Sequence, residues 1–277
     1  ILLGKTFGCC RFLYNQMLND KIREYAKTKK MLKNTPAMYK KEYPFLKEID
    51  SLALANVQLH LEKAYKNFFR DPKIGFPRFK SKHHSKNSYT TNVVNGNILV
   101  ESKRIRLPKL KWIAMKKHRE PAEGLRLKSV TVSMEPSGKY FASLLYEGYS
   151  CENQAAGPDY STAKILGIDY AMQGMAVFSE KVETEEAGFF RKNEKRLARE
   201  QRKLSRCVRG SHNYELQKKK VARCHEKIRN QRRDHLHKLS RKIADGYDAA
   251  AVEDIDMKAM GQCLHFGKSV QDNGYGM

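Results

Sequence analysis

Apolar side chains recur at helical spacing through the first part of the chain. In residues 6–27 they fall every three or four positions, which predicts an amphipathic helix whose apolar face comprises Cys10, Leu13, Tyr14, Met17, Leu18, Ile22 and Tyr25. Residues 28–43 are polar and interrupted by Pro36, so we expect a connection there. Pro44 can open a second helix, which would extend to Phe69 and carry an apolar stripe of Leu54, Val57, Leu61, Ala64 and Phe68. The pattern therefore predicts two helices that pack together.

A separate polar stripe follows the second predicted helix at the same spacing. Its members are Asn56, His60, Lys63 and Asn67. Amides and a lysine in line suit the base edges and phosphates of a nucleic acid. A face that is merely solvated would show the same pattern, so both interpretations stay open.

From residue 71 the apolar spacing shortens to every second position. Short alternating runs, typical of strands, occupy residues 88–91, 97–100, 105–108, 111–115, 129–134 and 139–146. Asn95-Gly96 separates the first two runs and Pro136-Ser137-Gly138 the last two, which predicts a hairpin at each place. Several short strands with interleaved basic and aromatic residues predict a small barrel of the oligonucleotide-binding type. Residues 151–163 have the composition of a linker.

Two acids stand in the short apolar runs of the last part of the chain. Asp169 lies within the run 165–170, which precedes another short strand at 175–178, and Glu253 ends the run 249–253. Two carboxylates on neighbouring buried strands would repel each other unless a cation lay between them. Phosphodiester cleavage by two metals uses such a pair to hold Mg²⁺ or Mn²⁺ ions ~4 Å apart. Alternatively, each acid caps the turn that follows its strand.

Between these acids the helical period returns together with most of the positive charge. Apolar residues at helical spacing are Val221, Cys224, Ile228, Leu236, Leu239 and Ile243, and residues 209–213 interrupt the helical pattern, so residues 189–242 predict a long helical hairpin. This segment holds 20 Lys and Arg against five acids. Such an excess indicates contact with a nucleic acid, although charged runs are often solvated faces. The candidate contacts are Lys203, Arg206, Arg209, Lys218, Lys219, Lys220, Arg223, Arg229, Arg232 and Arg233.

Composition narrows the class of protein further. The chain has 277 residues, 54 Lys and Arg against 30 Asp and Glu, a net charge of +24, and 40% hydrophobic residues. These values predict a packed core and a polyanionic partner. No apolar run approaches the ~20 residues of a membrane span, and the start of the chain does not resemble a secretory signal. The six Cys form no Cys-x-x-Cys pair, so we expect a cytoplasmic protein without a disulfide scaffold.

Several segments together resemble TnpB, the transposon-encoded OrfB-type family of RNA-guided DNA endonucleases related to type V CRISPR effectors. The resemblance includes Gly75-Phe76-Pro77-Arg78-Phe79-Lys80 and Gly167-Ile168-Asp169-Tyr170. It continues, in the order of the family and over essentially the whole chain, through residues 7–15, 64–69, 105–109, 197–205, 210–213, 225–240 and 252–254.

The resemblance implies a multidomain α+β fold. Its parts would be a helical recognition region at 1–70, a wedge (OB-like) β-barrel at 71–160, and an RNase H-like (RuvC) α/β nuclease domain at 164–277 that contains the basic hairpin. It also implies that Asp169 and Glu253 are catalytic and bind Mg²⁺ or Mn²⁺. The implied partners are a guide RNA from the transposon end and double-stranded target DNA with an adjacent motif. We expect a monomer or weak dimer, near the prokaryotic nucleoid, with no membrane contact.

Departures from the family pattern leave an alternative open. In the family, a zinc finger of two Cys-x-x-Cys pairs and then a third carboxylate follow the part matched here, and an opening strand precedes it. The sequence as given lacks these segments, so we expect a chain truncated at both ends, with zinc only in the missing finger and weak or no cleavage. The alternative is a nuclease-deficient RNA-guided DNA-binding protein that acts as a repressor or roadblock. A DNA-strand transferase is a third hypothesis, suggested by the name transposase that the family carries. It is disfavoured because the chain has no obvious paired-histidine motif with a Tyr nucleophile: His235-Leu236-His237 has the spacing but lies inside the predicted basic helix.

Overall fold

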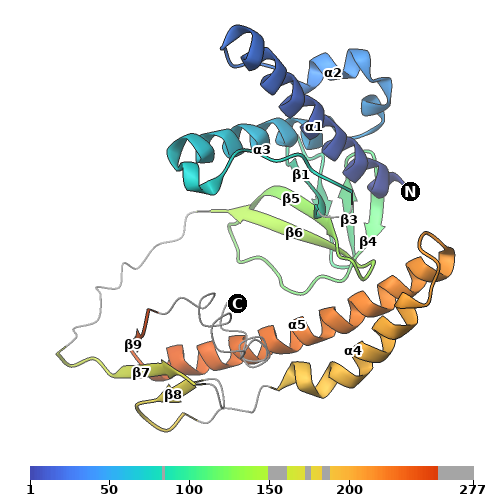
Figure 1. The fold of residues 1–277 in the computed structure, drawn as a ribbon. Coiled ribbons are helices and arrows are strands. Elements are labelled where there is room, and N and C mark those ends of the chain that lie inside the picture. Colours follow the sequence, from blue (N-terminus) through green and yellow to red (C-terminus); the bar gives the residue numbers. More distant parts are fainter. Residues whose placement is uncertain (83–84, 149–160, 172–175, 183–187, 255–277) are drawn as a thin grey trace. The chain divides into compact units, whose positions relative to one another are not determined.

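The chain has a mixed α+β fold that divides into two compact units, residues 1–151 and residues 152–277. The computed structural model describes residues 1–82, 85–148, 161–171, 176–182 and 188–254. Among these residues, the first unit contains helices and two sheets, and the second contains a helical hairpin and a third sheet (Figure 1). No helix in the described part of the chain is both long enough and apolar enough to cross a membrane.

The helices of the first unit are α1 (Leu2–Thr28), α2 (Pro36–Glu42), the 3₁₀ helix η1 (Pro44–Glu48), α3 (Ser51–Arg70) and the 3₁₀ helix η2 (Pro72–Ile74). The structure confirms the first predicted helix. It corrects the expected connection at 28–43, because Pro36 begins α2. It also corrects the start of the second helix, because Ile49 is extended and Asp50 caps α3 by accepting a hydrogen bond from the Leu52 amide at 3.0 Å.

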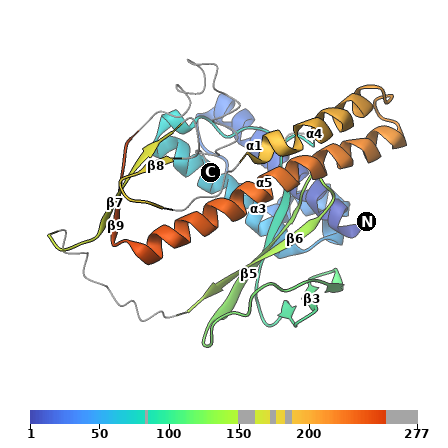
Figure 2. The same ribbon diagram turned by 90° about the horizontal axis from the view of Figure 1, so that it is seen from below.

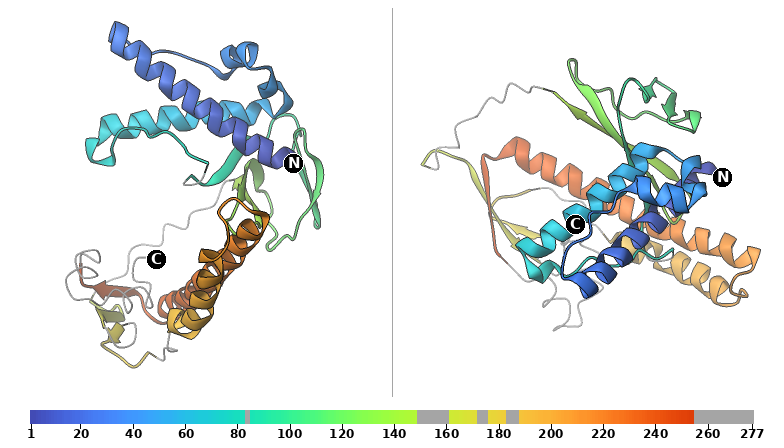
Figure 3. Two further views of the ribbon diagram at one scale, coloured as in Figure 1. Left: turned by 45° about the vertical axis from the view of Figure 1, so that its right-hand side comes forward. Right: turned by 90° about the horizontal axis from the view of Figure 1, so that it is seen from above.

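One hydrophobic core joins these helices to the strands that follow. Helices α1 and α3 pack against each other and lie on the same side of the strand β1 (Asn87–Asn92) (Figures 1 and 3). The predicted apolar faces supply fully buried side chains, among them Leu13, Met17, Leu18, Leu54 and Leu61. Ile22 and Tyr25 are exceptions on the last turns of α1, where they are exposed. The predicted apolar faces are therefore confirmed where α1 and α3 pack against the sheet.

The other strands of the first unit are β2 (Leu99–Val100), β3 (Arg104–Leu107), β4 (Lys111–Ala114), β5 (Arg126–Met134) and β6 (Tyr140–Glu147). They form two antiparallel sheets, with the orders β1-β5-β6 and β2-β3-β4. The predicted hairpin at 129–146 is confirmed as β5 and β6, and Gly138 occupies its turn at φ 86°. A positive φ of this size suits glycine, which has no Cβ to clash.

The predicted small barrel is not found among the described strands, which form two separate three-stranded sheets. Asn95 and Gly96 do adopt the positive φ values of a tight turn, 49° and 68°, but the strands on either side take different partners. The register pairs Thr91 of β1 with Val130 of β5, and the Thr91 hydroxyl hydrogen-bonds to the buried Asp50 carboxylate. The strand β1 is thus paired with β5 and joined to the start of α3.

The second unit contains β7 (Ile165–Tyr170), β8 (Ala176–Phe178), α4 (Phe189–Ser205), α5 (His212–Gly246) and β9 (Ala249–Val252). Helices α4 and α5 run side by side in opposite directions, which confirms the predicted hairpin (Figure 2). Leu197, Cys224 and Ile228 fill the seam between them. Gly210, at φ 83°, reverses the chain, and the Ser211 hydroxyl caps α5 by accepting from the Tyr214 amide at 3.1 Å. Most of the predicted linker at 151–163 lies outside the described residues.

Candidate functional site

The third sheet brings the two candidate carboxylates to equivalent positions on neighbouring strands. Its order is β8-β7-β9, with β7 antiparallel to β8 and parallel to β9. The parallel register runs from Ile165 opposite Ala249 to Ile168 opposite Val252. Asp169 is the next residue of β7, and Glu253 is the first residue after β9. Because adjacent strands lie ~4.8 Å apart, the register brings the backbone of these two residues to neighbouring places at the carboxyl end of the strand pair.

Both acids are exposed, which changes the physical argument made from sequence. The sequence predicts that carboxylates in buried strands need a cation to offset the free-energy cost of their desolvation. The structure shows only Leu166 fully buried in β7, while Asp169 and Glu253 lie at the accessible end of the strand pair. The desolvation argument therefore does not apply. The end of this strand pair still offers two carboxylates, whose oxygens are hard donors, with room for water around them.

Backbone and side-chain contacts fix the strands that carry these acids. The Gly167 amide donates to the Ser179 hydroxyl at 2.9 Å, and the Ser179 amide donates to the Gly167 carbonyl at 3.0 Å. A Cβ on Gly167 would lie 3.3 Å from the Ser179 Cβ, so this close approach favours glycine. At the other end of the pair, the Lys164 amide donates to the Asp248 carboxylate at 2.9 Å. The Lys164–Asp248 contact joins the starts of β7 and β9, and the Gly167–Ser179 contacts hold β8 against β7.

Nearly all the candidate basic side chains of the hairpin are exposed. Lys203, Arg206, Arg209, Lys218, Lys219, Lys220, Arg223, Arg229 and Arg233 are exposed, and Arg232 is half-buried. They belong to α4, the connection and α5, so one rigid element presents them. Exposed cations spaced along a helical hairpin can each approach a phosphate.

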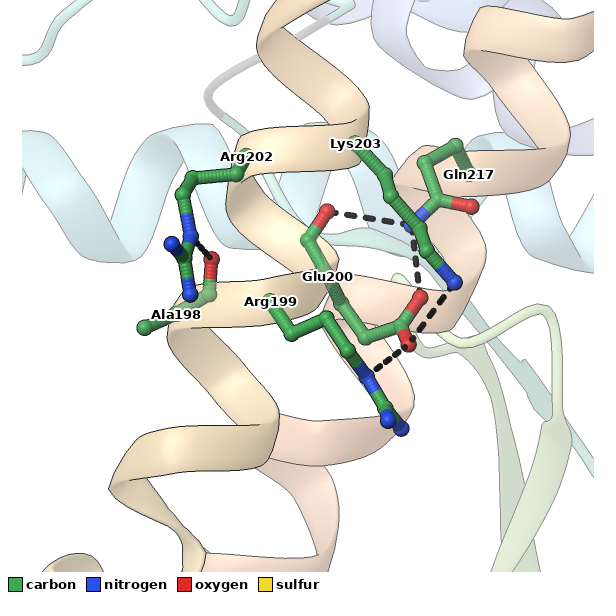
Figure 4. Close-up of polar contacts among 6 residues, drawn as sticks. All are labelled: Ala198, Arg199, Glu200, Arg202, Lys203 and Gln217. Atoms are coloured by element: carbon green, nitrogen blue, oxygen red, sulfur yellow. Dashed lines mark hydrogen bonds and ion pairs between the residues drawn. The ribbon is translucent and has the colours of Figure 1, made fainter.

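Sequence reasoning missed a polar contact that joins the two helices of the hairpin. The side-chain amide of Gln217 on α5 donates to the Glu200 carbonyl at 3.0 Å and to the Glu200 carboxylate at 2.7 Å (Figure 4). Arg199 and Lys203 lie 3.6 and 3.7 Å from the same carboxylate. The hydrogen bond from Gln217, together with these two cations, holds the pKa of Glu200 below its usual value. A signal existed in the sequence, because Glu200 is three residues after the seam residue Leu197 and faces the same way.

The polar stripe of α3 is not uniformly exposed. Asn56 is buried and its side-chain amide donates to the Leu52 carbonyl at 2.9 Å, whereas His60 and Lys63 are exposed and Asn67 is half-buried. Asn56 and His60 line a cavity of about 30 Å³ that also touches Lys80 and Tyr89. Partial burial, followed by the charges of Lys80 and Lys63, lowers the pKa of His60. The surface part of the stripe therefore begins at His60.

The paired-histidine motif of a strand transferase does not form in α5. His235 is buried, with its ring 5.6 Å from that of Phe189, whereas His237 is exposed. The two imidazoles therefore do not share a site. In addition, no group of three or more His, Cys, Asp or Glu among the described residues is placed to hold a metal ion.

Comparisons with known proteins match both units of the chain. A family model described as "Probable transposase" (OrfB_IS605) matches residues 148–263, and a model described as "Helix-turn-helix domain" matches residues 1–30. In the structure, the second match falls on the single helix α1 and the residues that flank it.

Two relatives extend the match over nearly the whole chain. A protein of Escherichia coli strain K12 named "Putative RNA-guided DNA endonuclease InsQ" is 34% identical over 265 residues, covering 91% of this chain and 62% of the relative. A protein of Streptomyces pristinaespiralis named "Putative RNA-guided DNA endonuclease" is 30% identical over 282 residues, covering 98% of this chain and 67% of the relative. The chain thus spans less than the full length of both relatives. On these matches, the chain belongs to the OrfB_IS605 family, also called TnpB.

Proposed function

We propose that the chain forms part of an RNA-guided DNA endonuclease in which Asp169 and Glu253 are the catalytic carboxylates. The observation that carries this proposal is the parallel register of β7 and β9, which supports a pairing of Asp169 in β7 with Glu253 directly after β9. The basic hairpin α4–α5 connects the same two strands in sequence. The names of the two relatives support the same activity.

The donor set fits a divalent cation such as Mg²⁺ or Mn²⁺. Both side chains offer carboxylate oxygens, which these hard cations prefer, and their exposure leaves room for the waters that Mg²⁺ retains. A bound metal would supply activation of water and stabilisation of the leaving oxygen. The role of this chain's own residues would be to hold the two carboxylates near each other, through the pairing of β7 with β9 and the Lys164–Asp248 contact.

The proposed domain roles follow the family layout. Residues 164–277 would be the RNase H-like nuclease domain, and the strand order β8-β7-β9 with a parallel β9 supports this assignment. Residues 1–70 would be the helical recognition region and residues 71–160 the wedge domain. His60, Lys63 and Asn67 would approach target duplex near the adjacent motif, since they are the accessible members of the α3 stripe.

The guide RNA is the proposed partner of the hairpin. A polyanion in this position would offset the mutual repulsion of 20 basic residues in a segment with five acids. Target sequence would then be read by base pairing with the guide, and the protein would contact mainly backbone phosphates.

The proposal is tested by removing each carboxylate in the guide-loaded protein. We expect Asp169→Ala and Glu253→Ala to lower metal-dependent cleavage of target DNA by ~100-fold or more, because even a ~1 Å displacement of reacting groups costs about that much. Binding of target DNA should persist. Asp234→Ala is the matched control, because Asp234 is an exposed acid of α5 paired with Lys238. Cleavage that survives Asp169→Ala would contradict the assignment.

The nuclease-deficient alternative makes a different prediction for the unaltered chain. It is favoured by one observation: within the described residues, no third metal-binding side chain joins Asp169 and Glu253. On this alternative, guide-loaded protein binds target DNA and protects it from other nucleases without cutting it in Mg²⁺ or Mn²⁺. Binding of Mn²⁺ that depends on Asp169, measured by electron paramagnetic resonance, would favour the endonuclease.

A further inference from the structure

The C-terminal end of α3 carries a cluster of aromatic rings, which comprises Tyr65, Phe68, Phe69 and Phe76. The Phe69 ring lies 6.2 Å from that of Tyr65 at an interplanar angle of 23°, so the two are stacked. Phe68 lies 5.4 Å from Phe69, and Phe76 lies 5.4 Å from Phe68 and 5.6 Å from Tyr65. The four rings therefore form one continuous aromatic group at the junction of α3 with the following loop.

Two members of this aromatic cluster are open to solvent. Phe69 is 67% exposed and Phe76 is 45% exposed, while Tyr65 beneath them is buried. Large aromatic side chains normally enter the core, where burial stabilises the fold. Contiguous exposed apolar groups, by contrast, mark sites of interaction. The exposed rings of Phe69 and Phe76 therefore rest against Tyr65 and Phe68, and much of each ring stays accessible to solvent.

Hydrogen bonds fix the backbone on both sides of the aromatic cluster. The Asp71 carboxylate accepts from the Lys73 amide at 3.0 Å and caps η2, and Gly75 leaves η2 at φ 84°. Further along, the Asn15 side chain on α1 accepts from the Lys80 amide at 2.8 Å and donates to the Lys80 carbonyl at 2.9 Å. The loop is therefore fastened at both ends, and Phe76 is held at the surface by a defined backbone.

The charge around the cluster indicates what it contacts. Lys66, Arg70 and Lys73 are exposed on α3 and η2, and none of them forms an ion pair with a described residue. The one acid among them, Asp71, is engaged as the cap of η2. Aromatic faces flanked by unpaired cations are typical of surfaces that bind single-stranded nucleic acids, where rings stack on bases and cations contact phosphates.

We propose that the aromatic cluster stacks with unpaired bases of an RNA. Stacking needs a base whose face is free, and folded RNA presents such bases in loops and ends, whereas duplex DNA keeps its bases stacked. An apolar protein segment would cover the rings but would leave the three cations without counterions. This inference rests on the proposed guide RNA and adds a specific contact, outside the basic hairpin, that reads unpaired nucleotides.

The test compares ring-removal variants on RNA probes of different structure. Phe69→Leu and Phe76→Leu, singly and together, keep an apolar side chain but remove the π-face. The matched control is Phe141→Leu, since Phe141 is 43% exposed on β6. The probes are a single-stranded RNA of about a dozen nucleotides carrying 2-aminopurine, an RNA duplex of the same sequence, and the corresponding single-stranded DNA. Fluorescence of Trp112 on heating verifies that each variant is folded.

We expect each ring removal to weaken binding of single-stranded RNA by roughly fivefold or more, the lower range for loss of base–aromatic stacking. The quenching of 2-aminopurine should decrease in parallel, and binding of duplex RNA and the behaviour of Phe141→Leu should stay as in the wild type. Unchanged affinity, or an equal loss in the control, would overturn the proposal. An equal loss on single-stranded DNA would overturn the assignment to RNA. Because this assay needs no guide and no cleavage, its outcome is independent of the carboxylate test above.

Discussion

The two units of the protein reach stability by different means. In the first unit, twenty buried apolar residues from α1, α3, the intervening helices and both sheets form one core. In the hairpin of the second unit, only three buried apolar residues, Leu197, Cys224 and Ile228, form the seam, with Phe190 and Val221 beside them. The hairpin instead uses a polar contact, between Glu200 and Gln217, and carries most of the net charge.

The difference in apolar core between the two units bears on the function of each. The first unit combines a large apolar core with an exposed aromatic cluster at the end of α3. A thin seam between two cationic helices gains less from apolar burial and is opposed by charge repulsion. The hairpin is therefore the part whose stability depends on counterions or on a bound polyanion, as expected if nucleic acid is its normal partner.

The largest effect should come from truncating the core of the first unit. Leu54 is fully buried where α3 meets α1 and the sheet, so Leu54→Ala should lower the free energy of unfolding by about 2–5 kcal/mol. Leu197→Ala in the hairpin should cost about 2 kcal/mol, the lower end of that range, because fewer neighbours surround it. The effect of Leu54→Ala is measured by urea unfolding followed by the fluorescence of Trp112, which lies on β4. The effect of Leu197→Ala is measured by hydrogen exchange of the α4 amides. Equal losses would contradict the contrast between the two cores.

The next effect concerns how the hairpin binds RNA. Neutralising three adjacent exposed cations, by changing Lys218, Lys219 and Lys220 to Gln, should weaken binding at low salt. The slope of log affinity against log salt should become shallower by roughly 2 on single-stranded RNA, at about 0.7 per phosphate contact. Changing Lys40, Lys41 and Lys47 of the first unit to Gln provides a control of equal charge. A slope that is unchanged in the hairpin variant would remove these lysines from the interface.

The smallest effect is a pH dependence located in the hairpin. Because the folded pKa of Glu200 is lowered, its contribution to stability is present above its ordinary pKa near 4.5 and is lost as the pH falls through the lowered folded value. Acidification should therefore loosen the hairpin. Amide exchange along α4 and α5, measured on either side of that pH, follows the change. Glu200→Gln removes the titrating group and should abolish this dependence. A pH dependence that persists in Glu200→Gln would show that another acidic residue causes the loosening.

Local patterns in the sequence were sufficient for the elements that depend on near neighbours. The periodicity of residues 6–27 gave α1, and that of residues 189–242 gave α4 and α5 with a break at Gly210. The hairpin of β5 and β6 followed from alternation around a glycine turn. These features rest on contacts within one or two turns of the chain, and such contacts leave a period in the sequence. The sequence also singled out Asp169 and Glu253 as candidates.

The tertiary structure decided which segments meet and which side chains are covered. It assigned β1 to β5 and not to β2, and it joined β1 to the start of α3 through the Asp50–Thr91 hydrogen bond. It set the parallel register of β7 and β9, which carries Asp169 and Glu253 to the same end of the sheet, and it left both of them exposed. It buried Asn56 and Glu200 while leaving Phe69 open. The physical reason is that pairing and burial depend on surfaces far apart in the sequence, which no local period records.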